Sequence, residues 1–199
     1  MDNSLYKVIF VLGNPGSGKN TQCDLIKEHF KFHHFGCGDL LRAEASREGS
    51  DKAELINDCI KNGKIVPSEV TCQLAKNEME RQGKNNIFLI DGFPRNLENL
   101  QGWDNVFKEE CKVLAVLHLD CSQETCIKRI KFRSQNSGRL DDNDESLKKR
   151  FTVFDEETTF SLKKLSERTT VLIINSDKND KSEVFNEIKE KLDKLLDSK

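Results

Sequence analysis

The sequence predicts an α/β fold in which a parallel sheet lies between layers of helices. Four apolar runs of strand length carry this prediction, the first beginning at Tyr6 and the others at 87–90, 113–117 and 171–174. Each run is continuously apolar rather than alternating, which indicates strands covered on both faces. A short run at 33–35 is a candidate fifth strand. Helix-like segments separate the runs, as in a doubly wound fold.

Size and composition favour one domain that acts on a small molecule. The 199 residues carry a net charge of −2, so no overall field favours nucleic acid or an anionic membrane. The apolar runs are too short to span a bilayer, and the first residues lack a signal-peptide pattern. The seven cysteines contain no C-x-x-C pair and the four histidines lack ligand spacing. We therefore expect reduced thiols and cytoplasmic residence, with the nucleus left open.

The first strand runs directly into a glycine-rich loop that ends in a lysine. Glycines at 13, 16 and 18 allow successive N–H groups to converge on an anion, and Lys19 adds a positive charge. A helix beginning near Gly18 would direct its free N–H groups to the same place. The expected phosphate-binding residues are Gly13, Asn14, Pro15, Gly16, Ser17, Gly18, Lys19, Asn20 and Thr21.

This loop meets the spacing G-x-x-x-x-G-K, but Asn20 stands where the strict motif has a hydroxyl for the metal. Thr21, one residue later, is the alternative source of that hydroxyl. The competing interpretation is a β–α turn with a solvated lysine. A phosphate-binding loop alone does not distinguish a kinase from a hydrolase or a switch.

The remaining elements follow in the βα order. We expect helices over 19–31, 68–82, 122–132, 145–166 and 182–196, and Ser68 is a candidate N-cap. Asp91 stands at the end of the strand over 87–90, where a carboxylate can hold the waters of a phosphate-bound Mg²⁺. Ligands bind at this carboxyl edge of an open parallel sheet, so the loops there are the expected site.

Arginines gather at the same predicted edge. Arg42 lies one helical turn beyond Gly38, and a tight turn at Gly92 and Pro94 presents Arg95. A third group brackets a polar loop over 134–144, which could fold over a phosphate. This group comprises Arg133, Arg139 and Arg150, with Asp141 and Asp142 able to orient them. An isolated arginine is more often a solvated surface charge, but clustering beside a phosphate loop weakens that interpretation.

The motifs together resemble the nucleoside monophosphate kinases of the adenylate kinase superfamily, and within them the UMP/CMP kinases. The matching motifs occur in family order: G-N-P-G-S-G-K-N-T-Q-C, G-D-L-L-R, G-K-I-V-P, D-G-F-P-R-N-x-x-N-L-Q-G-W and S-G-R-x-D-D-N. The resemblance implies a P-loop three-layer fold with a five-stranded parallel sheet, in a single kinase domain over 1–199. It also implies a helical monophosphate-binding insertion over 35–66 and a short lid over 133–144.

The resemblance assigns a role to each candidate residue. Residues 13–21, Arg133 and the Lys178 backbone would hold ATP, and Asp91 and Thr21 would hold Mg²⁺ through water. The catalytic cations would be Lys19, Arg95, Arg133, Arg139 and Arg150, and we expect Arg139→Ala to lower turnover far more than stability. The acceptor monophosphate would contact Arg42, Lys64, Ile65, Val66, Gly92, Phe93, Pro94, Arg95, Asn99, Arg139 and Arg150.

Asn99 selects among the acceptors that the resemblance allows. Adenylate kinases place Gln at this position, whose longer amide suits a purine, whereas Asn suits a pyrimidine and its amide can present either C=O or NH₂. The expected reaction is transfer of the ATP γ-phosphoryl group to UMP or CMP, giving ADP and UDP or CDP, by a monomer. The alternatives are an adenylate kinase acting on AMP and a non-catalytic nucleotide-binding module. The chain departs from the family pattern at Asn14, Asn20, Gly36, Cys37 and Ser134.

Overall fold

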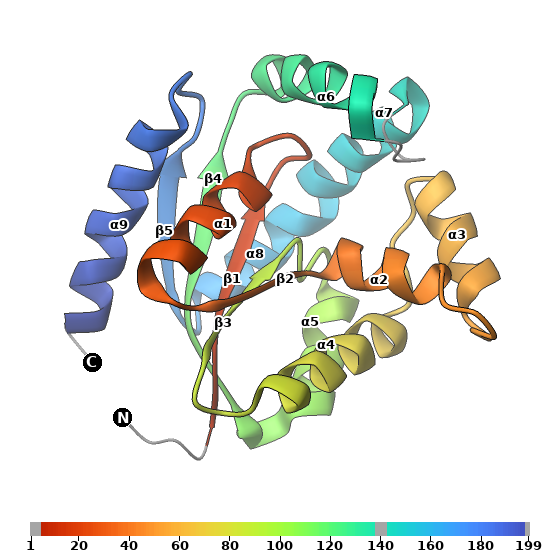
Figure 1. The fold of residues 1–199 in the computed structure, drawn as a ribbon, viewed down its shortest axis with the longest axis horizontal. Helices are drawn as coiled ribbons and strands as arrows, with labels where there is room; N and C mark the ends of the chain where they lie inside the picture. The colour runs from red at the N-terminus through yellow and green to blue at the C-terminus, as the bar shows by residue number, and fades with distance from the viewer. Residues whose placement is uncertain (1–4, 138–142, 198–199) are drawn as a thin grey trace.

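The computed structural model describes residues 5–137 and 143–197, and within these ranges five strands form one parallel sheet (Figure 1). The strand order is β2-β3-β1-β4-β5, and every neighbouring pair is parallel. The prediction of a five-stranded α/β fold is confirmed, including the short strand at 33–35. The strands are β1 Tyr6–Gly13, β2 His33–Gly36, β3 Ile87–Asp91, β4 Cys111–Asp120 and β5 Thr170–Asn175.

Helices connect consecutive strands and form the outer layers (Figure 1). The α-helices are α1 Lys19–Phe30, α2 Cys37–Ala45, α3 Ala53–Lys61, α4 Ser68–Gln82, α5 Leu97–Phe107, α6 Gln123–Ser137, α7 Asp144–Val153, α8 Thr159–Ser166 and α9 Lys181–Asp197. Two short helical segments complete the description, the 3₁₀ turn η1 Lys108–Glu110 and the π-helical η2 Phe154–Thr158.

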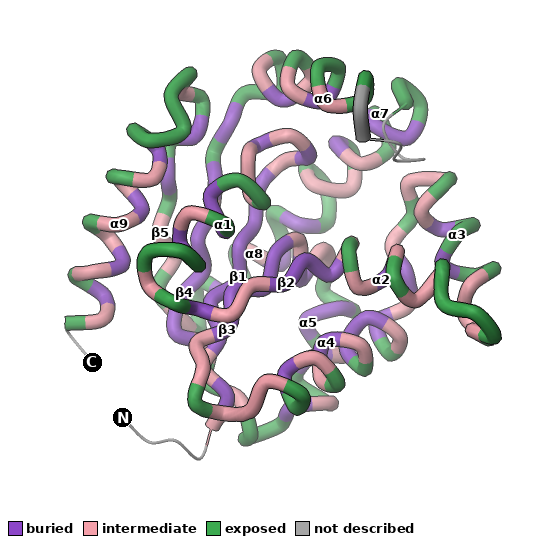
Figure 2. The backbone as a smooth tube through the Cα atoms, viewed as in Figure 1, coloured by how far each residue is buried: buried purple, intermediate pink, exposed green. Residues whose placement is uncertain are grey.

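The sheet is covered on both faces, as continuous apolarity predicts. One core packs α1 and α9 against the sheet through residues such as Ile26 and Ile188, and the other packs α4, α5 and α8 through residues such as Met79 and Trp103. Figure 2 shows β1 and β3 buried along most of their length. The three-layer prediction is therefore confirmed. The edge strand β5 is only partly buried, with Ile173 57% exposed, so the prediction that the run over 171–174 is covered on both faces is wrong.

Two smaller clusters lie beyond the main layers. Helices α2 and α3 share a small core of their own, formed by Leu41, Ile56, Cys59 and Val66. This core lies within the insertion expected over 35–66. A second cluster packs α6 against α7. In Figure 1 both groups lie beside the edge where β1 and β3 end. The insertion and the α6–α7 pair therefore flank the carboxyl edge of the sheet.

The helix boundaries differ from the prediction in three places. Helix α6 continues to Ser137 instead of ending at residue 132. The expected single helix over 145–166 is interrupted by the π-helical η2. Ser68 is the first residue of α4, and Pro67 takes the N-cap position predicted for it. No helix of the described ranges combines the length and apolarity that a membrane span requires.

Candidate active site

The loop after β1 has the backbone geometry of an anion cradle. Gly16 and Gly18 adopt φ values of 85° and 94°, which favour glycine. A Cβ atom on Gly16 would lie 2.5 Å from the carbonyl oxygen of Cys126, so this loop packs tightly against α6. Gly18 is the N-cap of α1, as predicted, and the first-turn N–H groups of α1 are available to an anion.

Lys19 lies folded over this loop. Its Nζ donates hydrogen bonds to the carbonyl oxygens of Gly13 at 2.9 Å and Asn14 at 3.0 Å. Burial lowers the pKa of Lys19, and the positive charges of Arg150 and Arg95 lower it further, whereas Asp91 raises it. A bound anion would raise the pKa of Lys19, because it stabilises the charged form of the amine.

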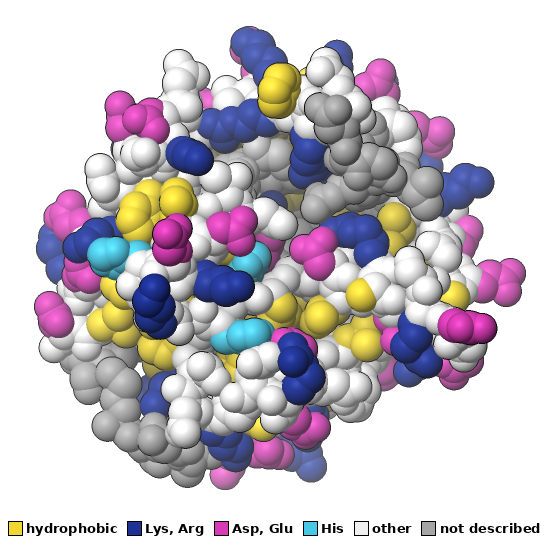
Figure 3. All heavy atoms as spheres, viewed as in Figure 1, with side chains coloured by type: hydrophobic (Ala, Val, Ile, Leu, Met, Phe, Trp, Pro, Cys, Tyr) yellow, Lys and Arg dark blue, Asp and Glu magenta, His cyan; other side chains and the backbone are white. Residues whose placement is uncertain are grey.

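A cavity of about 610 Å³ opens in front of the loop and brings the predicted cations together. In Figure 3 the surface is hollowed between α6 and α2, with Lys and Arg side chains beside the hollow. The positively charged residues lining the cavity come from four helices and from the loop between β3 and α5, and they are Lys19, Arg42, Arg95, Arg129, Arg133 and Arg150. Asn20, Thr21 and Asp91 also line it. Such a concentration of cations at one sheet edge suits a polyphosphate.

A smaller cavity of about 40 Å³ adjoins the first. The two share Gly38, Arg42, Gly63, Gly92, Arg95 and Arg150. The smaller cavity alone is lined by Cys37, Lys64, Ile65, Val66, Phe93 and Asn99, together with Leu41, Ile60 and Thr71. A ligand in it would therefore meet the same arginines as a ligand in front of the loop.

Several buried polar atoms of this region have no hydrogen-bond partner among the described residues. They include Asp91 Oδ1, which lines the larger cavity, and Asn99 Nδ2, which lines the smaller one. His34 Nε2 also has no partner, but His34 lines neither cavity. Burial raises the pKa of Asp91 despite the opposing charges of Lys19, His34 and Arg95. Native proteins pair nearly all buried polar atoms, so atoms left over beside a cavity point to a ligand.

Asn99 has a fixed orientation. Its Oδ1 accepts a hydrogen bond from the backbone N–H of Arg95 at 3.2 Å, and its own N–H donates to Asn96 Oδ1 at 2.8 Å. Because a backbone N–H can only donate, the amide oxygen must face Arg95. The NH₂ group is then the part of Asn99 left for a ligand.

Comparison with known proteins places the chain in a family. The family described as "Adenylate kinase" matches residues 11–169. The chain belongs to the adenylate kinase family.

Several similar proteins within this family are named UMP-CMP kinases. This chain is 44% identical to the UMP-CMP kinase of Homo sapiens over 191 residues, which cover 94% of this chain and 97% of that protein. The identity to the UMP-CMP kinase of Sus scrofa is 44% over 192 residues, with the same coverage. UMP-CMP kinase 2 of Caenorhabditis elegans is 50% identical over 154 residues, which cover 77% of this chain and 80% of that protein.

Most of the predicted site residues of this adenylate kinase family member line the two cavities. Asn14, Ser17, Pro94 and Lys178 line neither. Lys178 does reach the site through its carbonyl oxygen, which accepts a hydrogen bond from Arg129 Nη2 at 2.8 Å. Arg139 lies outside the described residues, as do Asp141 and Asp142.

Sequence reasoning missed Arg129. Its Nη1 lies 3.4 Å from the carbonyl oxygen of Ser17, so it connects α6 to the phosphate loop. Arg129 stands four residues before Arg133 on α6, which places the two on one helix face. The spacing of four residues between Arg129 and Arg133 could have identified Arg129 as a second site arginine from the sequence.

A metal ion at this site would rely on few protein ligands. Within 5–137 and 143–197 there is no group of three or more His, Cys, Asp or Glu side chains that could hold one. The partnerless Asp91 Oδ1 fits a hydrated cation whose other ligands come from phosphates. Asp91 therefore fits the predicted role.

Proposed function

We propose that this protein transfers the γ-phosphoryl group of ATP to the phosphate of UMP or CMP, giving ADP and UDP or CDP. One observation carries the proposal: Arg42, Arg95 and Arg150 line both the cavity in front of the phosphate loop and the cavity that contains Asn99. A donor and an acceptor phosphate can thus meet at shared arginines. The names of the relatives agree with this reaction.

The donor ATP would occupy the larger cavity. Its phosphates would lie against the loop over 13–21, with Lys19 moving from the Gly13 and Asn14 carbonyl oxygens to the phosphate. Arg133 and Arg129 would contact it from α6, and the Lys178 backbone would lie beside its base. The Arg129 hydrogen bond to Lys178 supports this placement because it links the two segments.

The acceptor would occupy the smaller cavity. Its phosphate would meet Arg42, Arg95 and Arg150, with Arg139 joining them, and its base would lie against 64–66 and Asn99. Arg42 is now paired with Asp39, with Nη2 2.6 Å from Oδ1, so acceptor binding would exchange a carboxylate for a phosphate. Gly92 and the buried Phe93 complete the wall of this pocket, and Pro94 fixes the turn behind it.

The reaction needs no protein nucleophile, because the acceptor phosphate already carries an oxyanion. The protein's contribution is to align two anions that repel each other and to spread positive charge over the transferring group. Lys19 and the arginines provide that charge. Closure of the insertion over 35–66 and of the lid over 133–144 would keep water from hydrolysing ATP.

Magnesium fits the residues present. Asp91 and Thr21 would hold it, mainly through water, since Asp91 Oδ1 is buried without a partner and both residues line the larger cavity. When bound, the ion neutralises charge on the phosphates. Lys19 Nζ donates to the loop carbonyl oxygens of Gly13 and Asn14, and its charge would add to that of the ion in binding the phosphates.

The Asn99 amide supports a pyrimidine acceptor. Its available NH₂ group can donate to the ring acceptors of cytosine or uracil. The monomeric state is a prediction from the family resemblance. Cytoplasmic residence, with the nucleus left open, is a prediction from the cysteine pattern.

A coupled assay with ATP and CMP, UMP, dCMP or AMP tests this proposal. We expect the pyrimidine monophosphates to be the preferred acceptors. AMP as the best acceptor would favour an adenylate kinase, and ATP binding with no acceptor turned over would favour a nucleotide-binding module.

A further inference from the structure

Asn20 is a polar residue of the phosphate loop to whose side chain the reaction proposed above assigns no particular contact. It is the second residue of α1, exposed, and it lines the larger cavity beside Lys19 and Thr21. Its side-chain amide makes no hydrogen bond with any residue in the described ranges. A side chain in this place has its polar group available to a ligand.

The position of Asn20 in the motif indicates which ligand. In the pattern G-x-x-x-x-G-K-[ST], the residue after the lysine places its side-chain oxygen on the magnesium of the bound nucleotide. Gly13, Gly18 and Lys19 keep that pattern here, and α1 begins at Lys19 as the motif requires. Asn20 brings an amide oxygen to the same slot, and amide oxygens are suitable ligands of Mg²⁺ and Ca²⁺.

A second, independent observation points to a cation at the same place. Asp91 is 5% exposed and lines the same cavity, yet its Oδ1 has no partner among the described residues. Lys19 Nζ donates to the carbonyl oxygens of Gly13 and Asn14, and no hydrogen bond from Lys19 to Asp91 Oδ1 accompanies these two among the described residues. Asn20 and Asp91 thus line the larger cavity from α1 and from the end of β3.

We propose that Asn20 Oδ1 is a ligand of the divalent cation that accompanies the donor nucleotide, at the cavity that Asp91 also lines. This proposal depends on one part of the proposed function, namely that ATP binds at the phosphate loop together with a metal ion. The alternative within the site is that the Asn20 NH₂ group contacts a phosphate oxygen. These two roles differ in whether the contribution of Asn20 to ATP binding depends on the metal.

Calorimetric titration of ATP, without an acceptor, separates the two roles. Asn20→Ala should weaken ATP binding about tenfold to a hundredfold with Mg²⁺ present, the range typical of lost support at a metal site, and leave binding in EDTA unchanged. Asn20→Ser restores the hydroxyl of the strict motif and should recover most of the loss. Asn105→Ala, at an exposed position of α5 outside both cavities, is the matched control and should change neither constant.

A spectroscopic readout tests direct ligation. With Mn²⁺ and ADP bound, line broadening of the Mn²⁺ EPR signal by ¹⁷O-water counts the waters on the metal. We expect more waters in Asn20→Ala than in the wild-type protein.

The other outcomes overturn the inference. Equal weakening with Mg²⁺ and in EDTA would assign Asn20 to a phosphate oxygen. Unchanged or tighter binding with Mg²⁺ would mean that the amide only occupies space. If the wild-type protein bound no ATP under either condition, the proposed function itself would fail, which is distinguishable from failure at Asn20 alone.

Discussion

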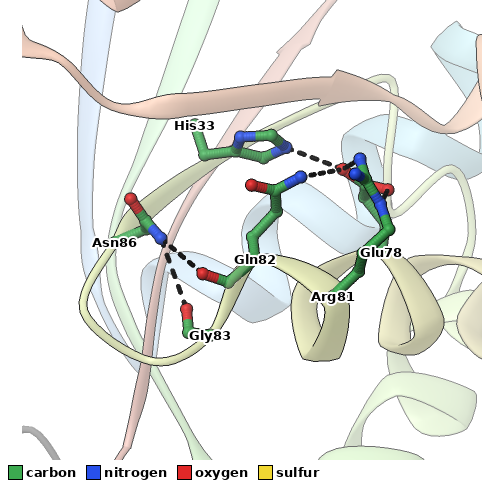
Figure 4. Close-up of polar contacts among 6 residues, drawn as sticks. All are labelled: His33, Glu78, Arg81, Gln82, Gly83 and Asn86. Carbon is green, nitrogen blue, oxygen red and sulfur yellow. Dashed lines mark hydrogen bonds and ion pairs between the residues drawn. The ribbon is translucent and has the colours of Figure 1, made fainter.

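Two neighbouring histidines of β2 face opposite sides of the sheet and belong to two polar clusters of different character. His33 faces α4, where its Nε2 lies 2.8 Å from Glu78 Oε1 (Figure 4). Arg81 donates to both carboxylate oxygens of Glu78, at 3.0 and 2.8 Å, and Gln82 donates a further bond at 3.2 Å. The Glu78 carboxylate is therefore fully used by its neighbours.

His34 faces the other side of the sheet and lines neither cavity of the nucleotide site. Its Nδ1 lies 3.7 Å from Asp24 Oδ1, and its Nε2 is buried without a partner among the described residues. Burial lowers the pKa of His34, while the Asp91 carboxylate raises it. Asp91 and Asn99 likewise have buried atoms without partners.

The difference separates polar groups that stabilise the fold from polar groups that await a ligand. A buried donor or acceptor without a partner costs about 1–3 kcal/mol, so such atoms persist where function requires them. We expect substitutions in the His33–Glu78 cluster to change stability and substitutions at the nucleotide site to change activity.

The largest expected effect is on activity, at Lys19. Lys19→Met removes a cation that would contact the transferring phosphate, so kcat should fall by about 10²–10³. The unfolding midpoint should not fall, because the buried charge is removed together with its desolvation cost. A coupled assay and urea unfolding measure the two quantities.

Lys128→Met is the matched control for Lys19→Met. Lys128 lies on α6, pairs with Glu124 at 2.6 Å and is 73% exposed. Both activity and stability should stay at wild-type values. A Lys19→Met protein with wild-type kcat would remove Lys19 from the mechanism.

Asn99→Gln should have the next largest effect, and on specificity. The longer amide enters a pocket of about 40 Å³, so kcat/KM for CMP should fall about tenfold or more relative to its value for AMP. Steady-state kinetics with both acceptors give the ratio, and circular dichroism shows whether the fold persists. An unchanged ratio would mean that Asn99 does not read the base.

Glu78→Ala should lower stability and leave activity intact. Glu78 is only 14% exposed, and its loss leaves His33 and Gln82 without their shared acceptor. We expect the free energy of unfolding to fall by about 1–3 kcal/mol. Urea unfolding measures it, and a fall in kcat with unchanged stability would contradict the division between the clusters.

The smallest effect is a pH dependence of the same cluster. Burial raises the pKa of Glu78, but hydrogen bonds from Arg81, then His33 and Gln82, outweigh burial and hold this pKa below its ordinary value of 4.5. A carboxylate whose pKa is lower in the folded state stabilises the fold above its unfolded pKa and loses that contribution as the pH falls through the folded pKa.

The measurement is the stability difference between wild type and Glu78→Gln. This difference in the free energy of unfolding should be largest at pH 7 and should decrease below about pH 4.5. A difference that grew on acidification would reverse the assigned sign.

The fold and much of the site could be predicted from local patterns. Continuous apolar runs identify β1, β3, β4 and β5. In β1 and β3 the run is continuous because both faces of the strand are buried, whereas β5 has the same pattern although Ile173 is 57% exposed. The glycine spacing predicts the loop because few sequences place those conformations before a lysine and a helix. Arg42 and Arg95 were found because each follows a strand at the edge where ligands bind.

The rest depends on packing that the sequence does not display. In the sequence, Arg129 cannot be distinguished from the other charged residues of α6. It lines the cavity because α6 packs against the phosphate loop, where Cys126 lies close to Gly16. The different environments of His33 and His34 require the pairing of β2 with β3. Ser68 satisfies the composition rule for an N-cap, but the helix starts one residue earlier than that role allows.

The most direct test of two adjoining phosphate sites is a crystal structure with a bisubstrate analogue in which adenosine and uridine are joined by five phosphates. We predict one analogue per chain, with its adenosine diphosphate end against residues 13–21, its central phosphates among Arg42, Arg95 and Arg150, and its uracil beside Asn99. An analogue bound with those arginines turned to solvent, or with its uracil outside the smaller cavity, would contradict the account.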